Sequence, residues 1–431
     1  MMDVRNENNH VFNIKLAKLT GLYHILDPGT ATFRGRNVYH IITACILLYM
    51  CVVSIILNLS GLYYWTLNIP ISIDYFWKSE TTLYVIYKIW IVIRHSNDIW
   101  NFLSITWHRH AVTLFSIRQR HILNRWRERS VRFTTMFAIM YYSSLVFYLG
   151  STLVFRKDIL PVKNRDGSVA FYRQNVMHFY LIASDETYNE YYYMFYFAEA
   201  FYIAFLTISF LIFDILLVTL CFGMCCQMQM TCSDFESVGH RPLRDHNSPI
   251  DYKDENKKIP NEHDVVYDEL KTIIMDHQAV MEKYEDFLSL FRRVMLLQIF
   301  VSSFSVITLW FTFIMSFSDD ERFKASEVVL KKMFCSIPPL LFQIFMVCYL
   351  FGNLHNQKDS IIFALYSSNW TEMDMKCKKL ILLTMQLNNA NHQKLKFTRT
   401  KIVNLEMFFK TMGDCYTIIS VLVNYIQRSG E

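Results

Sequence analysis

Residues 41–73 read IITACILLYMCVVSIILNLSGLYYWTLNIPISI, a run of 33 positions without a charged side chain. A helix needs about 20 mostly apolar residues to cross the roughly 30 Å hydrocarbon core of a bilayer. Because Pro70 and the short turn before it divide the run, it predicts two membrane spans, the second covering 71–93. Lipid as well as water is therefore expected to act as solvent for this chain.

Further windows of similar length follow this run. Residues 133–155, 294–318 and 333–354 are free of charge, whereas 191–223 and 402–427 contain a few acidic or basic residues. Polar residues inside a span usually face protein or a water-filled cavity. With 53% hydrophobic residues overall, the chain is predicted to be an all-α polytopic membrane protein with seven transmembrane helices.

The connections between these windows differ strongly in their basic residues. Segments 1–37, 94–132, 223–293 and 353–401 together hold 30 Lys and Arg, and the connections on the other side hold 11. Cytosolic loops carry the excess of Lys and Arg. We therefore predict a cytosolic N-terminus and an external C-terminus.

Two cytosolic stretches show helical periodicity beyond the spans. Apolar residues recur every three or four positions over 266–291 and over 371–388, which predicts amphipathic helices that extend the bundle. These helices either pack on each other within one subunit or form a platform that joins several subunits. The predicted organisation is a cytosolic segment (1–37), spans one to four (38–232), a disordered polar cytosolic insert (233–263), a helix leading into span five (264–318), span six (333–354), cytosolic anchor helices (355–401) and span seven (402–427).

The outer halves of spans two, three, four and six are rich in aromatic and hydroxyl side chains. Such a mixture suits a small apolar ligand, because aromatic walls enclose it and a few hydroxyls orient it. Aromatic residues at helical spacing also arise from plain packing in a membrane bundle. The candidate ligand-binding residues are Phe76, Tyr84, Tyr148, Ser151, Thr152, Phe197, Phe201 and Phe342, together with the acidic Glu80.

Charged residues in spans two and four fall at matching depths. Glu80 and Glu199 lie in the outer halves, and Lys88 and Asp214 lie in the inner halves. Charge pairs at two depths could tie these helices together. The alternative is that the charged groups reach to the membrane interface.

The last span ends in a charge-free run over 415–427. Thr417, Val421, Asn424 and Tyr425 fall on one helical face of this run. The face could line a pore that an apolar ring closes by excluding water, or it could be a packed helix surface. Periodicity leaves both interpretations open.

Motifs of soluble enzymes are absent from the sequence. It has no Walker A loop, no G-x-S-x-G or G-x-G-x-x-G, and no H-E-x-x-H or C-x-x-C. We therefore expect neither an enzyme activity nor a bound metal or cofactor. Cys225 and Cys226 at the inner end of span four are either palmitoylated or ordinary thiols.

A set of motifs over the last hundred residues resembles one known family, the insect odorant receptors. The motifs are Gln343-x-Phe345-x-x-Cys348-Tyr349, Gly352-Asn353, Tyr366-Ser367-Ser368-Asn369-Trp370, Lys379-Leu380, Met385-Gln386, Leu405-Glu406-x-Phe408, Gly413, Thr417 and Val421-Leu422-Val423. Residues 399–403 depart from the Gly and Pro that many members carry before the last span. The chain also lacks the very long second cytosolic loop and the near-invariant sequence of the shared co-receptor, so it resembles a ligand-tuning subunit.

This resemblance implies a ligand-gated cation channel with seven helices and an internal N-terminus. It implies a small volatile hydrophobic odorant bound in the outer bundle, and a tetramer formed with the co-receptor in the plasma membrane of olfactory neuron dendrites. Permeant cations and membrane lipid are the other implied partners, with no nucleic acid and no cofactor. The resemblance assigns the hydrophobic gate to Val421 and Tyr425, with Asn424 beside them, and the anchor domain to the two cytosolic stripes.

Two other receptor classes remain as alternatives. A G-protein-coupled receptor predicts an external N-terminus together with DRY-like and NPxxY-like motifs, and this sequence has neither motif. A gustatory-type ligand-gated channel is closer, and the stretch from Tyr366 to Trp370 argues against it.

Overall fold

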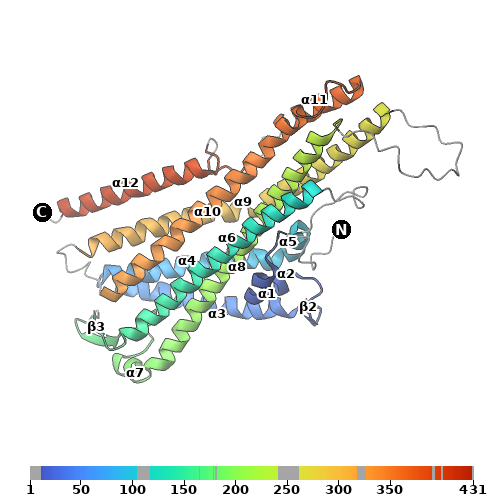
Figure 1. The fold of residues 1–431 in the computed structure, drawn as a ribbon. Helices are drawn as coiled ribbons and strands as arrows, with labels where there is room; N and C mark the ends of the chain where they lie inside the picture. Colours follow the sequence, from blue (N-terminus) through green and yellow to red (C-terminus); the bar gives the residue numbers. More distant parts are fainter. Residues whose placement is uncertain are drawn as a thin grey trace.

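Seven long helices dominate the computed structural model, which describes residues 11–103, 117–164, 166–177, 179, 182–240, 262–317, 327–390, 394–398 and 401–429. They run side by side as an elongated bundle (Figure 1), and each covers most of one predicted span. The all-α, polytopic prediction is thereby confirmed. The long helices are α3 (Val38–Tyr64), α4 (Ile69–Arg94), α6 (Ile117–Val154), α8 (Tyr192–Ser237), α9 (Glu262–Met315), α10 (Glu327–Tyr366) and α12 (Leu405–Ser429).

Shorter elements cover the ends of the bundle. They are α1 (Ile14–Thr20), α2 (Leu22–Leu26), α5 (Ser96–Leu103), α7 (Asp185–Glu190) and α11 (Met375–Ala390), with strands β1 (Thr32–Phe33), β2 (Arg36–Asn37), β3 (Ile159–Lys163) and β4 (Val169–Arg173). Each pair of strands is an antiparallel hairpin, and the longer one pairs Ile159 with Arg173 and Lys163 with Val169. The α1–α2 region, α5 and α11 lie toward one end of the bundle, and β3, α7 and the C-terminus lie toward the other (Figure 1).

Helix α3 shows what a lipid-facing element looks like in this chain. Leu48, Ile55 and Leu62 recur at seven-residue intervals, and 60–68% of each side chain is exposed. In water such a stripe would be an unfavourable apolar patch, whereas in a bilayer it contacts hydrocarbon. Five of the described helices, α3, α6, α8, α9 and α10, are long and apolar enough to cross a membrane by length and composition. Helices α4 and α12 carry more charged residues.

Helix α8 is the centre of the bundle. Within its most apolar stretch 78% of the residues are buried, against 22% for α3. It packs against α4, α6, α9 and α10. Polar side chains on α8 therefore face protein, which makes α8 the helix on which a buried site can be built.

The start of α4 is fixed by local sequence. The Asn68 side chain caps the helix by accepting the N–H of Ile71 at 3.1 Å, and Pro70 occupies the first turn, where no N–H is needed. Eight residues after Asn68, the ring of Phe76 lies against α3 so closely that a Cβ on Gly61 would meet it at 3.1 Å. The tight α3–α4 hairpin therefore follows from an N-cap and one glycine contact.

The bundle continues well beyond the predicted membrane region at one end. Helix α9 has 54 residues, which is roughly 80 Å at 1.5 Å per residue. Its residues Tyr284 and Phe287 are buried, and the Phe287 ring lies 6.0 Å from that of Phe351 on α10. The stripe at 266–291 and the fifth span thus belong to one helix whose extension packs within this chain.

The boundary of the predicted disordered insert is wrong at its N-terminal side. Residues 233–237 continue α8, because Phe235 is buried with its ring 5.9 Å from that of His277. Beyond the helix, the N–H of Asn369 donates to the carbonyl of Val238 at 3.2 Å. Residues 241–261 of the insert lie outside the described part of the chain.

Candidate functional site: a cavity between four helices

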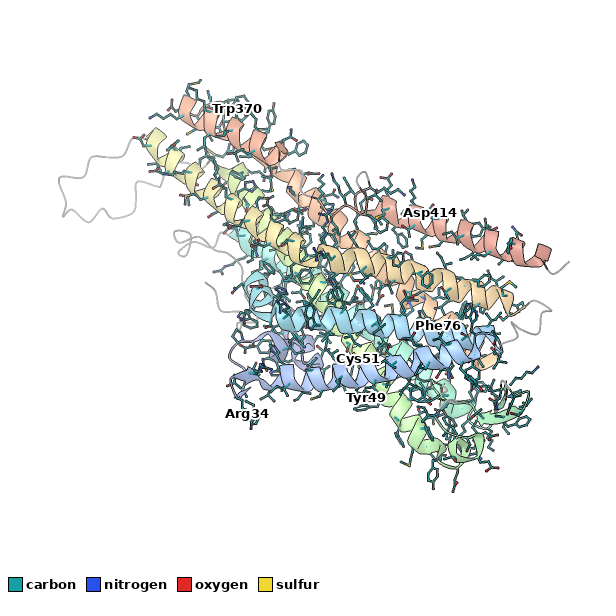
Figure 2. The ribbon with its side chains drawn as sticks, turned by 180° about the vertical axis from the view of Figure 1, so that it is seen from behind. Arg34, Tyr49, Cys51, Phe76, Trp370 and Asp414 are labelled. Carbon is teal, nitrogen blue, oxygen red and sulfur yellow. The ribbon has the colours of Figure 1, made fainter. Side chains whose placement is uncertain are left out.

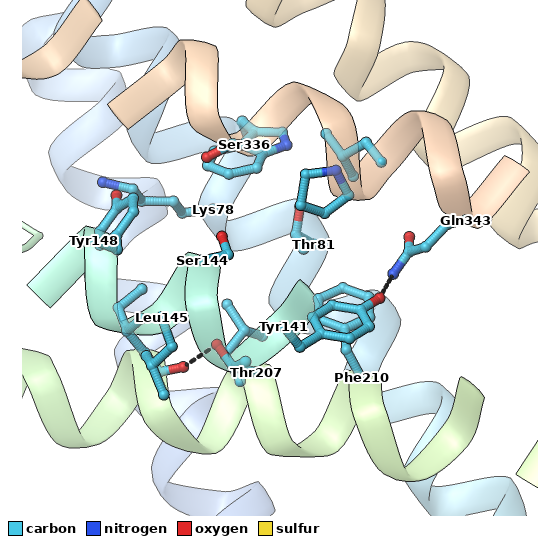
Figure 3. A pocket seen from close by; sticks show the side chains of 15 residues that line it. Lys78, Thr81, Tyr141, Ser144, Leu145, Tyr148, Thr207, Phe210, Ser336 and Gln343 are labelled. Carbon is cyan, nitrogen blue, oxygen red and sulfur yellow. Dashed lines mark hydrogen bonds between the residues drawn. The ribbon is translucent and has the colours of Figure 1, made fainter. Parts of the chain in front are cut away.

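A cavity of about 110 Å³ lies among α4, α6, α8 and α10 (Figure 3). Its walls are mainly aromatic and aliphatic, with Lys78 toward one end, Gln343 toward the other and a few hydroxyl groups between them (Figure 3). That volume is comparable to the roughly 150 Å³ cavity that holds a benzene molecule in a protein core. The lining residues are Trp77, Lys78, Thr81, Tyr141, Ser144, Leu145, Tyr148, Ile203, Leu206, Thr207, Phe210, Ser336, Pro339, Leu340 and Gln343.

One end of the cavity carries an ion pair within α4. Lys78 Nζ donates to Asp74 Oδ2 at 2.5 Å, one helical turn earlier, and lies 5.9 Å from the ring centre of Tyr148 (Figure 3). Because the carboxylate is so close, the lysine charge is compensated without a ligand. The ammonium therefore contributes polarity to the wall but no unpaired charge.

The other end of the cavity begins a chain of polar contacts. Gln343 Nε2 donates to the Tyr141 hydroxyl at 2.5 Å, and this hydroxyl in turn donates to Asp214 Oδ2 at 2.7 Å. Asp214 Oδ1 lies 3.7 Å from Lys88 Nζ, and both side chains are fully buried. Ser302 of α9 donates to Gln343 Oε1 at 3.3 Å. One continuous network thus joins the cavity to α4, α6, α8, α9 and α10.

Aromatic rings surround the buried ammonium group of this network. Lys88 Nζ lies 4.7 Å from the ring centre of Tyr84, 5.2 Å from that of Phe210 and 4.5 Å from that of Phe213. The negative faces of these rings offset part of the cost of removing the charge from water. Since Phe210 also lines the cavity, the charged pair and the cavity share a wall.

The predicted charge pairing between spans two and four is confirmed at the inner depth and wrong at the outer one. Lys88 and Asp214 do pair across α4 and α8. Glu199 instead accepts the N–H of Met177 at 2.6 Å and the Tyr188 hydroxyl at 2.7 Å. A carboxylate on the central helix thus satisfies backbone donors of the segment between β4 and α7.

The same segment is held from a second side. Lys332 of α10 donates from Nζ to the carbonyl of Asn175 at 2.8 Å, and its Nζ lies 5.2 Å from the ring centre of Tyr148. Tyr148 therefore lines the cavity and also contacts Lys332, which holds the segment between β4 and α7. This arrangement closes the bundle near the cavity at the end that carries β3 and α7.

The structure brings one of the predicted ligand residues, Tyr148, into the cavity lining. Phe342 and Tyr84 do not line the cavity and contact other partners: the Phe342 ring lies 4.8 Å from that of Phe137, and the Tyr84 hydroxyl donates to the carbonyl of Val294 at 3.1 Å. Thr152 is buried and donates to the Tyr148 carbonyl. Ser151 instead lines a separate open groove between α6, α9 and α10.

The remaining predicted ligand residues lie outside the cavity. Phe197 and Phe201 on α8 are 69% and 57% exposed, and the Phe201 ring packs at 6.2 Å from that of Tyr49 on α3. Phe76 packs toward α3 in the N-terminal third of α4 (Figure 2), and Glu80 is half-buried. Aromatic content alone does not distinguish a lipid-facing side from an inward one, because successive helix residues turn by about 100°.

Sequence reasoning missed Thr81, Tyr141 and Gln343 as cavity residues. Each is a polar group inside a span, where polar side chains turn inward. Lys78 carried the same signal and lies two residues from each of the predicted positions Phe76 and Glu80. Inward polar residues would thus have located the cavity better than aromatic ones.

The predicted pore face of α12 points away from the rest of the chain. Val421 and Tyr425 are 61% and 71% exposed, and Thr417 is also exposed. Asn424 lies at the edge of a groove between α9, α10 and α12. Met407, Cys415 and Ile419 form the buried side of α12.

The motif residues gather at the junctions of α10. Cys348 is buried, and Gly352 faces Asn404 at the start of α12, with Asn353 beside it on α10 and Gly413 farther along α12. The rings of Tyr366 and Trp370 lie 6.2 Å apart at the far end of the extension (Figure 2). None of these six residues lines the cavity, whereas Gln343 of the first motif does.

No group of three or more potential metal ligands occurs among the described residues. The cavity itself offers apolar walls, hydrogen-bonding groups and a compensated charge.

Comparison with known proteins adds a family and a fold. The profile of the 7tm Odorant receptor family matches residues 79–416. Odorant receptor 46a, isoform B, of Drosophila melanogaster is 29% identical over 83 residues, which is 19% of this chain and 22% of that protein. The match thus spans about a fifth of that relative's length.

Two solved structures share the fold. The insect olfactory receptor OR5 from Machilis hrabei superposes with a TM-score of 0.70 at 14% identity, covering 95% of this chain and 97% of that one. The same receptor in complex with eugenol gives a TM-score of 0.66 at 15% identity, covering 96% and 98%.

Proposed function

This chain belongs to the insect odorant receptor family, and from that premise we propose that it is the odorant-binding subunit of a ligand-gated cation channel. The observation that carries the proposal is the cavity lined by α4, α6, α8 and α10. Its volume of about 110 Å³ suits a small volatile molecule with roughly one ring. The eugenol complex of the similar OR5 fold supports binding of an aromatic odorant in this architecture.

The polar network gives ligand binding a route to the other helices. A ligand that contacts Tyr141 or Gln343 acts on the same network as Asp214, Lys88 and Ser302. If the ligand binds one arrangement of these helices more tightly than another, it shifts the balance between closed and open states by that difference in affinity. No covalent chemistry on the ligand is involved, so we propose a receptor and not an enzyme.

Helix α10 has a weak point beside the cavity. Pro338 and Pro339 lie inside the helix, and Pro339 lines the cavity. Neither can donate a backbone hydrogen bond, so the carbonyls one turn earlier lack their usual helical partners. We propose that α10 bends here when ligand binds and moves the groove it shares with α12.

The proposed pore lies along α12. Its exposed face with Val421 and Tyr425 is suited to meet the same helix of other subunits, where apolar side chains would close a pore by excluding water.

Outside the predicted membrane region, α11 exposes Leu382, Leu383 and Leu387 while burying Cys377 and Ile381. We propose that this exposed stripe joins subunits, in a tetramer with the co-receptor.

We further propose that the channel lies in the plasma membrane of olfactory neuron dendrites, with permeant cations and lipid as its other partners. The test is to express the chain with and without the co-receptor, apply a panel of volatiles and record currents while G-protein signalling is blocked. We expect evoked current that requires both subunits and persists under the block. Loss of all current under the block would favour the G-protein-coupled alternative.

A further inference from the structure

Two buried polar atoms in the cavity wall have no hydrogen-bond partner among the residues that the structure describes. They are Trp77 Nε1 and Thr81 Oγ1, and both atoms are buried. The two residues are one turn apart on α4 and both line the cavity (Figure 3 labels Thr81). Buried donors without a partner are rare, because each one costs free energy comparable to a lost hydrogen bond.

Other threonines on these helices do use their hydroxyls in hydrogen bonds. Thr82, the next residue, donates to the carbonyl of Lys78 at 2.7 Å, and Thr207 on the facing helix donates to the carbonyl of Ile203 at 2.8 Å. A helical threonine commonly satisfies its hydroxyl in this way. Thr81 does not, although it is only 5% exposed, so its hydroxyl is available to a molecule inside the cavity.

The chemistry of the two groups selects the ligand. An indole N–H donates and cannot accept, and a threonine hydroxyl can donate as well. A carbonyl oxygen has two lone pairs and no proton of its own, so it can accept from both. A carboxylate does not fit, because Asp74 already compensates the nearby Lys78 at 2.5 Å and a second anion would be buried without a partner.

We propose that Trp77 and Thr81 form the polar subsite of the cavity, and that the ligand is a small apolar aldehyde, ketone or ester whose carbonyl oxygen accepts from both. This inference rests on the proposed ligand-binding function and specifies its ligand class. A pure hydrocarbon of the same shape fills the apolar walls but leaves both donors unpaired.

The experiment compares isosteric pairs of probes that differ only in the acceptor. Benzaldehyde with styrene and cyclohexanone with methylenecyclohexane are applied to the chain co-expressed with the co-receptor, and half-maximal concentrations for current are recorded. Binding is measured separately as the shift in Tm of the purified full chain. We expect each carbonyl probe to act at about tenfold lower concentration than its alkene partner.

Variants then assign this preference to the two residues. T81V removes the hydroxyl at nearly constant shape, and W77F removes the N–H while keeping a ring; each is expected to bring the carbonyl-to-alkene ratio close to one. T207V is the matched control, since the same change on the opposite wall removes a hydroxyl that already has a partner. It should leave the ratio unchanged. If W77F does not fold, T81V decides alone.

Four outcomes separate this inference from the channel proposal. Equal potency of carbonyl and alkene probes would overturn it, as would a carbonyl preference that survives in T81V. If no probe shifts the Tm or evokes a current, the inference is likewise overturned. If carbonyl probes raise the Tm more than alkenes but evoke no current, the subsite stands and the channel proposal fails.

Discussion

At the scale of single residues, the molecule depends on a charge pair in its interior. Lys88 and Asp214 are fully buried and 3.7 Å apart, and Tyr141 connects them to the cavity through Gln343. Removing one partner of a buried pair leaves the other charge uncompensated, which costs about 3–5 kcal/mol. Removing both can be nearly neutral.

We therefore predict that D214N lowers the Tm and the surface expression of the chain strongly, and that adding K88M to D214N restores most of both. The matched control is D359N, because Asp359 pairs with Lys394 at 2.6 Å while remaining 54% exposed. An exposed pair contributes about 0–1 kcal/mol. Equal losses in D214N and D359N would show that the buried pair has no special role.

The same scale shows where sequence reasoning succeeds and where it does not. Depth along a span is readable from the sequence, so Lys88 and Asp214 could be matched. The direction in which a residue points around its helix is not readable, because aromatic side chains such as Phe197 and Phe201 are as stable facing lipid as they are lining a cavity. Partners from distant segments, such as Met177 for Glu199, leave no local signal either.

At the scale of elements, the helices follow from apolar length, but their ends do not. Helix α8 continues to Ser237 because Phe235 finds a packing partner on α9, a tertiary contact that overrides a polar local composition. The β3–β4 hairpin was not predicted at all. Its five-residue strands alternate exposed and buried residues around a turn with Gly167 at φ 85°, a pattern far weaker than a membrane span.

Helix α12 carries the prediction that belongs to this scale. If its exposed face lines the pore, V421A and Y425A should change basal or evoked current, because a smaller apolar ring excludes water less well. F409A is the matched control: Phe409 is 69% exposed on the same helix but points roughly 160° away from Tyr425, and it does not line the groove that α12 shares with α9 and α10. Single-channel conductance and kinetics that match the wild type in V421A and Y425A would contradict the pore assignment.

At the scale of the whole molecule, the elements at each end of the helix bundle can be compared with the distribution of Lys and Arg along the sequence. The N-terminal helices, α5 and α11 lie toward one end of the bundle, and the C-terminus lies toward the other (Figure 1). The first end contains the connections in which basic residues are concentrated. If all seven long helices cross the membrane, as the sequence predicts, the two termini lie on opposite sides of it.

The orientation can be tested on intact cells. We predict that an N-terminal tag is stained only after permeabilisation and that a C-terminal tag is stained without it, because the basic connections remain in the cytosol. A tag inserted within 241–261 should behave like the N-terminal one. Staining of the N-terminal tag from outside would reverse the topology and reopen the G-protein-coupled alternative.

The central claim is that a ligand in the cavity opens a channel directly. It is tested most directly by recording odorant-evoked current in excised patches without GTP, for the wild type, L145W and L153W. Leu145 lines the cavity, whereas Leu153, two turns along the same helix, is 41% exposed. We predict that wild type and L153W respond without GTP and that L145W, whose indole fills the cavity, does not. Currents that vanish without GTP, or that persist unchanged in L145W, would contradict the account.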